Sequence, residues 1–454
     1  MKLVIAEKPS VAMALASVLG ARTRKDGYVE GNGYIVSWCV GHLVGLCDAS
    51  EYDEKYKKWR YEDLPIVPEC WKHKILEGTK KQFGILKKLM RDSKVDEVIC
   101  ATDAGREGEL IFRLVYEQAG CKKPMKRLWI SSMEEQAIKD GFSSLKDGSC
   151  YDSLYQSALC RAKADWLVGI NASRLFSVLY NQNLKVGRVQ TPTLAMIVDR
   201  NQKIKEFTKE KYYMAHIKFD DMDAVTEHFQ KKEDADKVAA ECQERMCEVE
   251  KDDVKEKTVR PPKLYDLTTL QREANRMFGY TAQQTLDAVQ EMYEQKLVTY
   301  PRTDSQYLTD EMGESTETLI QMLLGKMPYA EGLEYQPDVS KVLNSKKVSD
   351  HHAIIPTVEV AKADIGKLKE RNCKILYLIS ARVLTATADP YIYESHKCQI
   401  TCNYHTFYLS AKKIKQEGFK SIENKLKQFF GVKSEKEEPE LDIWDGKHYG
   451  PCDS

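Results

Sequence analysis

The sequence lacks the features that mark several large classes of protein. It has no apolar run long enough to span a bilayer, and its start, "MKLVIAEKPS", reaches Glu7 before a signal-peptide core could form. Its 13 cysteines are odd in number, scattered, and include no Cys-x-x-Cys pair, which argues against a disulfide scaffold and a zinc site. We therefore expect a cytoplasmic protein with free thiols and no membrane association.

An excess of charge of one sign is also missing. The 69 basic side chains are balanced by 69 acidic ones, which argues against a uniformly basic surface that binds any polyanion. The zero net charge does not exclude a local basic groove, because nucleic-acid binding depends on where the charges lie. The 454 residues have a globular composition and no visible repeat, so we expect roughly two to four domains.

The chain opens with strands and helices in alternation. A β-branched run at residues 2–7 precedes a helical pattern that ends at Gly20, and a strand pattern at 95–103 precedes a helix that ends at Gly120. This order predicts a parallel sheet with helices on both faces. Functional residues are expected beyond the carboxyl ends of such strands, where Glu7 and Asp103 fall.

Later segments predict further helices and strands. Residues 151–200 have a helical pattern with an interruption near 181–192, whereas the charged stretch 250–263 is predicted to be a linker held extended by Pro261 and Pro262. Thr281 and Gln284 predict a capping box at the start of an amphipathic helix that leads to Tyr300. Two helices and a short strand there indicate a winged-helix-like module, and strands are expected again after residue 391.

Acidic side chains gather near the two early strand ends. Asp103, Glu107 and Glu109 surround a strand-to-helix turn, and with Glu7 they could form an oxygen-rich pocket for Mg²⁺. The alternative is that Glu107 and Glu109 only favour a helix N-terminus. Lys8 precedes another helix start, where it is either a solvated charge or a group that holds a phosphate or protonates a leaving oxygen.

Basic residues are in local excess between residues 161 and 188. Opposed only by Asp165, they are Arg161, Lys163, Arg174, Lys185 and Arg188. Such an excess would suit a groove for a DNA backbone, and the alternative is ordinary surface charge on helices.

The stretch "LVTYPRTDS" contains Tyr300, which is either a core aromatic residue or a nucleophile. A phenol with a pKa near 10 is a weak nucleophile at neutral pH, so it needs help. Arg302 could provide it by binding the phosphate under attack. His351 and His352 in "SDHHAIIPT" are either ordinary hydrogen-bonded groups or contacts to phosphate.

The ordered motifs "IAEKPS", "GHLVGL", "ATDAGREGE", "RAKADWLVGI", "VGRVQTP", "YPRTDS" and "HHAIIPT" resemble those of the type IA DNA topoisomerases, and most closely topoisomerase III. The resemblance covers roughly residues 1–430. It implies a multi-domain α/β protein whose parts form a toroid, complete or incomplete. The implied parts are a Toprim domain (1–150), a helical DNA-binding domain (151–210), a β-rich arch (211–262 and 389–430), a winged-helix-like domain with the catalytic tyrosine (263–388) and a polar tail (431–454).

The resemblance also implies an activity. Tyr300 would attack a phosphodiester in single-stranded DNA and become joined to the 5′ phosphate, after which strand passage and religation without ATP would relax negative supercoils or decatenate DNA. Matched by motif, the catalytic residues would be Tyr300, Arg302, Glu7 and Lys8; the DNA-contacting residues His42, Arg106, Arg161, Arg188, Gln190 and His351; and the Mg²⁺ ligands Glu7, Asp103 and Glu107. The expected partner of the monomer is single-stranded or negatively supercoiled DNA, and whether a helicase assists stays open.

The sequence departs from the family pattern in two places. The acidic motif is commonly Asp-x-Asp-x-Glu, but Gly105 stands at its middle position, which predicts weaker Mg²⁺ binding. No counterpart of the family's ring-closing segment or zinc modules is found before Ser454, so cleavage is a firmer expectation than strand passage. The alternatives are a Toprim nuclease or primase, which would not need Tyr300, and a truncated, non-catalytic or cleavage-only DNA-binding remnant.

Overall fold

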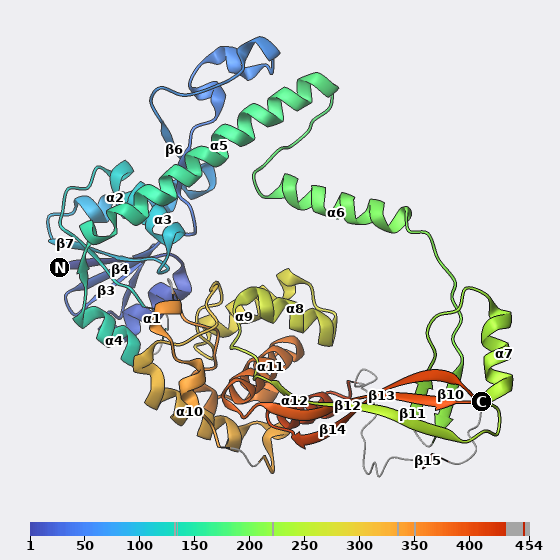
Figure 1. Cartoon of the computed structure of the whole chain (residues 1–454). Helices are drawn as coiled ribbons and strands as arrows, with labels where there is room; N and C mark the ends of the chain where they lie inside the picture. The colour runs from blue at the N-terminus through green and yellow to red at the C-terminus, as the bar shows by residue number, and fades with distance from the viewer. Residues whose placement is uncertain are drawn as a thin grey trace. The chain divides into compact units, whose positions relative to one another are not determined.

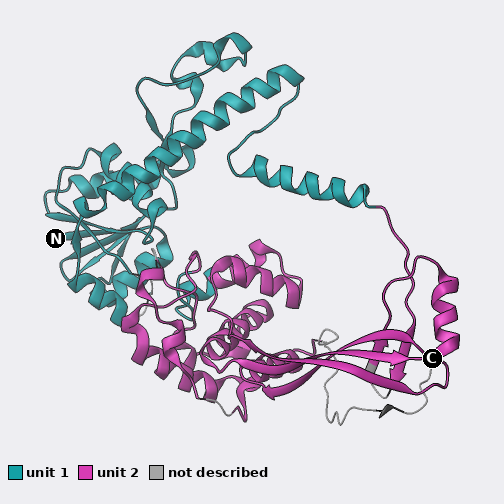
Figure 2. Ribbon diagram, in the orientation of Figure 1, with its two compact units in different colours: residues 1–207, 290–300 teal, residues 208–289, 301–454 magenta. Residues whose placement is uncertain are grey.

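A computed structural model describes the chain except residues 131–132, 134, 220–221, 334–335, 349–350, 433–447 and 450–454. Most of the expected polar tail lies outside the described residues. The chain divides into two units, residues 1–207 with 290–300 and residues 208–289 with 301–454, which Figure 2 shows in different colours. No helix in the described part of the chain combines the length and apolar character needed to cross a membrane.

The first unit is built on a largely parallel sheet. Its strand order is β2 (Thr23–Lys25), β3 (Tyr28–Gly31), β4 (Tyr34–Trp38), β1 (Lys2–Ala6), β7 (Glu97–Ala101), β8 (Met125–Arg127) and β9 (Lys146–Asp147). The central strand β1 pairs in parallel with β4 on one side and β7 on the other. The predicted parallel sheet is therefore confirmed, with short antiparallel strands at both edges.

Helices cover both faces of this sheet, as predicted (Figure 1). One face packs against α2 (Lys80–Arg91), α3 (Arg106–Ala119) and the start of α5 (Asp152–Tyr180), while α1 (Pro9–Leu19) and α4 (Glu135–Ser143) lie on the other. Successive residues of β1 point to opposite faces, so Leu3 faces the first layer and Val4 the second, and both are fully buried. A small hairpin of β5 (Val44–Leu46) and β6 (His73–Ile75) stands beside the sheet.

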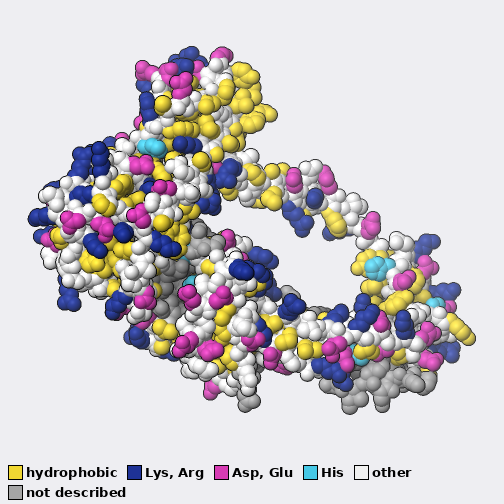
Figure 3. Space-filling view, turned by 60° about the vertical axis from the view of Figure 1, so that its left-hand side comes forward, with side chains coloured by type: hydrophobic (Ala, Val, Ile, Leu, Met, Phe, Trp, Pro, Cys, Tyr) yellow, Lys and Arg dark blue, Asp and Glu magenta, His cyan; other side chains and the backbone are white. Residues whose placement is uncertain are grey.

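Glycines end two of these helices where the sequence predicts. Gly20 after α1 and Gly120 after α3 have φ angles of 77° and 64°, a left-handed conformation that glycine adopts without steric cost. The helical pattern at 151–200 becomes α5 and α6 (Gln190–Lys205), and it is interrupted as expected. Every residue of α6 is exposed, including Leu194, Met196 and Ile197, and Figure 3 shows hydrophobic side chains on its surface.

The second unit contains a six-stranded sheet and a helical part. The strands are β10 (His216–Phe219), β11 (Met222–Val225), β14 (His405–Gln416), β13 (Tyr391–Cys402), β12 (Cys247–Val259) and β15 (His448–Tyr449), in that order. Helix α7 (Lys232–Cys242) packs on it through Val238 and Cys242. The other helices are α8 (Leu267–Phe278), α9 (Ala282–Glu294, of which residues 290–294 belong to the first unit), α10 (Gly313–Lys326), α11 (Glu370–Thr387) and α12 (Phe419–Phe429).

The linker prediction for residues 250–263 is wrong over most of its length. This stretch belongs to β12, which pairs with β13 without interruption from Lys251–Gln399 to Val259–Tyr391. Its charged side chains are mostly exposed, so the strand needs no alternating apolar pattern. What holds it is backbone pairing with a segment more than a hundred residues later, which no local pattern reveals.

The helices before Tyr300 follow the prediction closely. Thr281 and Gln284 make both bonds of the capping box: the Thr281 hydroxyl accepts from the Gln284 N–H (3.1 Å), and the Gln284 side chain accepts from the Thr281 N–H (2.9 Å). Val289 and Tyr293 are buried on the inner face of α9. The short strand expected next is reduced to isolated bridges, Tyr265–Ile354 and Leu308–Leu343.

Candidate active site

The carboxyl ends of three neighbouring strands in the first unit gather the candidate residues. Glu7 follows β1, Asp103 follows β7, and His42 lies in the loop after β4. Because Ala6 pairs with both Trp38 and Ala101, these loops begin at the same edge of the sheet. The prediction that Glu7 and Asp103 lie beyond the carboxyl ends of neighbouring parallel strands is therefore confirmed.

Glu7, Asp103 and Tyr300 are in direct contact. The Asp103 N–H donates to the Glu7 carboxylate at 3.2 Å, and the Tyr300 hydroxyl donates to Oδ2 of Asp103 at 3.1 Å. All three belong to the first unit, although 197 residues separate Asp103 from Tyr300. The ring of Tyr293 meets that of Tyr300 edge to face at 5.5 Å and fixes its orientation. Tyr300 thus presents its oxygen to a carboxylate, as a nucleophile that must lose a proton requires.

Glu107 takes a different partner. Its Oε2 lies 3.5 Å from Nε2 of His42, and hydrogen bonding to this ring lowers the pKa of Glu107. The nearby positive charges of His42, Arg161 and Arg106 lower it further, against the effect of burial. Glu107 is therefore ionised at neutral pH, and three of the candidate DNA-contacting residues, His42, Arg106 and Arg161, lie near its carboxylate.

Within the described residues, no three acidic, histidine or cysteine side chains cluster closely enough to form a complete metal site. Glu7 and Asp103 nonetheless fit Mg²⁺ by chemistry, since this ion takes one or two carboxylates and completes its shell with water and phosphate oxygens. The structure brings these two candidate ligands together, while the third, Glu107, faces His42.

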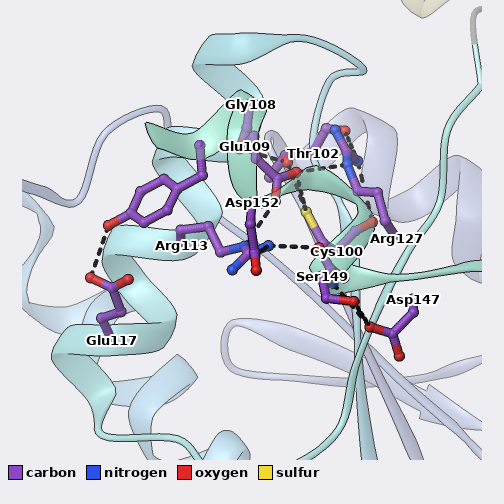
Figure 4. Close-up of polar contacts among 12 residues, drawn as sticks. Cys100, Thr102, Gly108, Glu109, Arg113, Glu117, Arg127, Asp147, Ser149 and Asp152 are labelled. Carbon is purple, nitrogen blue, oxygen red and sulfur yellow. Dashed lines mark hydrogen bonds and ion pairs between the residues drawn. The ribbon is translucent and has the colours of Figure 1, made fainter. Parts of the chain in front are cut away.

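Glu109, the last acid of the motif, is a structural anchor. It is 1% exposed and forms ion pairs with Arg113 (2.9 Å) and Arg127 (3.0 Å), as Figure 4 shows. Helical periodicity contains a signal for this, because Glu109 shares a face with the buried Phe112. Glu109 therefore neutralises buried arginines and is not a group of the site itself.

Arg127, which sequence reasoning missed, holds the loop that carries Asp103. Its guanidinium donates to the backbone carbonyls of Thr102 (2.7 Å) and Asp103 (2.7 Å), and its side chain is fully buried. It also stacks against Trp129, 5.1 Å from the ring centroid. The sequence around Arg127 carries no signal for this role, because the short strand β8 that it ends contains two basic residues among three.

Gly108 allows α3 to approach this loop. A Cβ at this position would lie 2.1 Å from the Asp103 carbonyl oxygen, so no other residue fits without a backbone shift. The Thr102 hydroxyl also donates to the Gly108 carbonyl at 2.8 Å. Asp103 is thus positioned by contacts on both sides of its backbone.

The basic candidates of the first unit lie on several elements. Lys8 caps α1 and has no ion-pair partner among the described residues, and Arg106 is exposed at the start of α3. On α5 and the loop before α6, Asp165 accepts two hydrogen bonds from Arg188 (2.5 and 3.3 Å) and lies 3.9 Å from Arg161. Gln190 is exposed at the start of α6.

Arg302 and His351 belong to the second unit. Arg302 is exposed, whereas His351 is buried and its carbonyl accepts a hydrogen bond from the Thr303 hydroxyl at 2.9 Å. This bond, from a side chain to a backbone carbonyl, ties the "YPRTDS" and "HHAIIPT" segments together. In the second segment, burial lowers the pKa of the His352 imidazole.

The class of protein is shown by the families whose sequence models match the chain. A sequence model of the Toprim domain matches residues 2–133, and a sequence model described as DNA topoisomerase matches residues 149–444. The chain therefore belongs to the type IA DNA topoisomerase family, which confirms the resemblance seen in its motifs. Toprim domains as a class bind metal ions.

Curated relatives carry the name DNA topoisomerase 3. The protein of Staphylococcus haemolyticus is 39% identical over 96% of this chain, that of Shouchella clausii 42% over 93%, and that of Bacillus cereus (strain ATCC 14579) 43% over 92%. The chain spans only 59–62% of the length of these relatives. Full-length topoisomerase I of Thermotoga maritima has a similar fold, with a TM-score of 0.72 and 24% identity over 99% of this chain and 70% of the other.

Proposed function

We propose that the protein cleaves single-stranded DNA through Tyr300 and reseals it. The observation that carries this proposal is the bond from the Tyr300 hydroxyl to Asp103, whose backbone is in turn bonded to Glu7. A tyrosine has no such role in a Toprim nuclease or primase. Membership of the topoisomerase family supports the same conclusion.

The chemistry follows from this arrangement. The Tyr300 oxygen attacks the phosphorus, its proton passes to Asp103, and the bond from phosphorus to the 3′ oxygen of the preceding nucleotide breaks. The 5′ phosphate stays on Tyr300, and the leaving oxygen takes a proton from the ammonium group of Lys8, the neighbour of Glu7 in the chain, and becomes a 3′ hydroxyl. Arg302 binds the phosphate under attack. One phosphoester replaces another, so religation is the reverse reaction and needs no ATP.

DNA is the proposed partner, and we propose that the protein acts on it as a monomer in the cytoplasm. His42, Arg106, Arg161, Arg188, Gln190 and His351 are proposed to contact the strand. Passage of another strand through the break, with relaxation of negative supercoils or decatenation as the outcome, extends the proposal to the activity of the whole protein. The domain boundaries given above are part of the same proposal.

The test is a covalent adduct. The protein is mixed with an end-labelled single-stranded oligonucleotide and Mg²⁺, quenched with denaturant and examined for label on the protein band. The native chain and the Tyr293→Phe control, which keeps the Tyr300 hydroxyl, are expected to form the adduct, while Tyr300→Phe forms none. Cleavage by Tyr300→Phe at the native level would indicate a nuclease, and binding by the native chain without an adduct would indicate a non-catalytic remnant.

Mg²⁺ held by Glu7, Asp103 and Glu107 would supply positive charge against the DNA phosphate. Gly105 removes one carboxylate from the family's motif. Its φ of 178° is extended backbone that any residue adopts, so aspartate fits there without backbone strain. We expect Gly105→Asp to reach half-maximal adduct formation at several-fold lower Mg²⁺ than the native chain. Identical magnesium titration curves for the two proteins would refute this.

A further inference from the structure

A pocket in the second unit contains none of the residues proposed for catalysis, metal binding or DNA contact. It has a volume of ≈ 460 Å³ and opens where β12 ends and the chain turns through two prolines. Its other walls come from the segment after Tyr300, from the short 3₁₀ helix Val339–Val342 and from the end of α11. Its principal lining residues are Arg260, Pro261, Pro262, Lys263, Tyr307 and Lys341.

Tyr307 is held rigidly in the wall of this pocket. Its N–H donates to the Ser305 hydroxyl (3.1 Å), and its carbonyl accepts from the Ala353 N–H (2.9 Å). The next residue, Leu308, exchanges backbone bonds of 2.9 Å with Val342 and Asn344. The backbone that carries the Tyr307 ring is therefore fixed, so a ligand that packs on this ring does not have to order the segment when it binds.

Two ammonium groups lie over this ring without a counter-charge. The Nζ atoms of Lys263 and Lys347 are 5.4 and 4.8 Å from the ring centroid of Tyr307, and neither is paired with a carboxylate of the described chain. Burial alone would raise the pKa of Tyr307, but hydrogen bonds from Lys347 and Lys263 and their charges lower it. Lys263, which lines the pocket, and Lys347, which adjoins it at Tyr307, thus make this wall positive and suited to an anion.

The pocket has two further basic residues, of which one is paired with carboxylates and one is not. Lys341 is already balanced by Asp338 and Asp389, each at 3.6 Å. Arg260 lines the pocket without an ion pair in the described structure and adds to the positive charge. Arg260 and Lys263 in the lining, and Lys347 beside the Tyr307 ring, are therefore available to a ligand on one side of the pocket.

The remaining wall is apolar and stiff. It consists of Pro261, Pro262, Val342, Ala386 and Pro390. Proline rings have few conformations to lose, so a flat apolar group can pack on them at little entropic cost. Cations for a phosphate beside an apolar surface for a base are the combination by which proteins bind single-stranded nucleic acid. A paired base would not be free to enter.

We propose that this pocket binds one nucleotide unit of a single DNA strand, with its phosphate at Lys263 and Lys347 and its base on the proline wall. The identity of the ligand as DNA rests on the proposed function. The pocket holds the strand and takes no part in bond breaking, because none of the groups proposed for the chemistry lines it.

The test is the salt dependence of binding to a fluorescent oligothymidylate, measured by anisotropy. The full chain is compared with Lys347→Gln, which adjoins the pocket at the Tyr307 ring, and with Lys346→Gln, a matched control that removes the same charge from an exposed neighbouring residue without a contact to that ring in the described structure. Loss of one phosphate contact is expected to reduce the slope of log K against log salt by about 0.7. Lys347→Gln should show this change and a several-fold weaker affinity, and Lys346→Gln neither.

The Tyr300 adduct, measured in the same preparations, separates the two proposals. We expect Lys347→Gln to need a several-fold higher oligonucleotide concentration than the native chain for half-maximal adduct formation, and Lys346→Gln to need the same concentration as the native chain. If the native chain forms the adduct but Lys347→Gln and Lys346→Gln bind alike, the pocket proposal is wrong and the proposed function stands. If the native chain neither binds nor forms the adduct, the proposed function fails as well. Inorganic phosphate that competes at Lys347 as strongly as the oligonucleotide would identify a free-anion site and overturn the strand proposal.

Discussion

Replacement of Asp103 by asparagine is expected to slow formation of the Tyr300 adduct about a hundredfold or more. Oδ2 of Asp103 accepts the hydrogen bond of the attacking hydroxyl at 3.1 Å, and an amide of the same shape has no capacity to take its proton. The measurement is a single-turnover rate of adduct formation with excess protein. An unchanged rate for Asp103→Asn at neutral pH would remove Asp103 from the mechanism.

The pH dependence of the same variant separates loss of the proton acceptor from loss of a metal ligand. If proton transfer is what Asp103→Asn lacks, its rate should rise with pH about tenfold per unit, because the phenolate fraction grows this way below a pKa near 10. A defect in metal binding alone would instead be restored by a higher Mg²⁺ concentration at constant pH.

Glu109→Gln is expected to destabilise the first unit by about 3–5 kcal/mol, the usual effect of removing one partner of a buried ion pair. Glu109 is 1% exposed, and its loss of charge leaves the fully buried Arg127 without its counter-ion, whereas Arg113 keeps Asp152 at 2.7 Å. For a unit of this size the Tm should fall on the order of 10 °C. Thermal unfolding followed by circular dichroism measures the change.

Glu107→Gln is the matched control for this prediction. It is the same substitution two residues earlier on the same helix, at a side chain that is 58% exposed, so the Tm should change little. Equal melting temperatures for the two variants would show that the Glu109–Arg127 pair does not support the loop that carries Asp103.

Local patterns were sufficient for the parts of the fold that local interactions determine. The ends of α1 and α3 at Gly20 and Gly120 follow from the left-handed conformation that glycine favours, and the capping box of Thr281 and Gln284 involves residues three positions apart. The position of Glu7 and Asp103 at one edge also followed, because parallel strands bring their carboxyl ends together.

Interactions between distant segments could not be predicted. The sequence of residues 250–263 predicts a linker, whereas most of this stretch is part of β12, because its partner strand β13 begins only at Tyr391. The role of Arg127 depends on the backbone carbonyls it contacts, which carry no signature in the sequence. Three acids around one turn looked alike in the sequence, whereas the structure turns one to Tyr300, one to His42 and one into a buried ion pair.

The most direct test of the central claim is which side of the broken strand stays on the protein. The same oligonucleotide is labelled either at its 3′ end or at its 5′ end, incubated with the native chain and Mg²⁺, and denatured. The mechanism predicts that the 3′-labelled fragment remains attached to the protein through Tyr300, while the 5′-labelled fragment is released with a free 3′ hydroxyl. Label on the protein only from the 5′-labelled strand, or an adduct that persists in Tyr300→Phe, would contradict it.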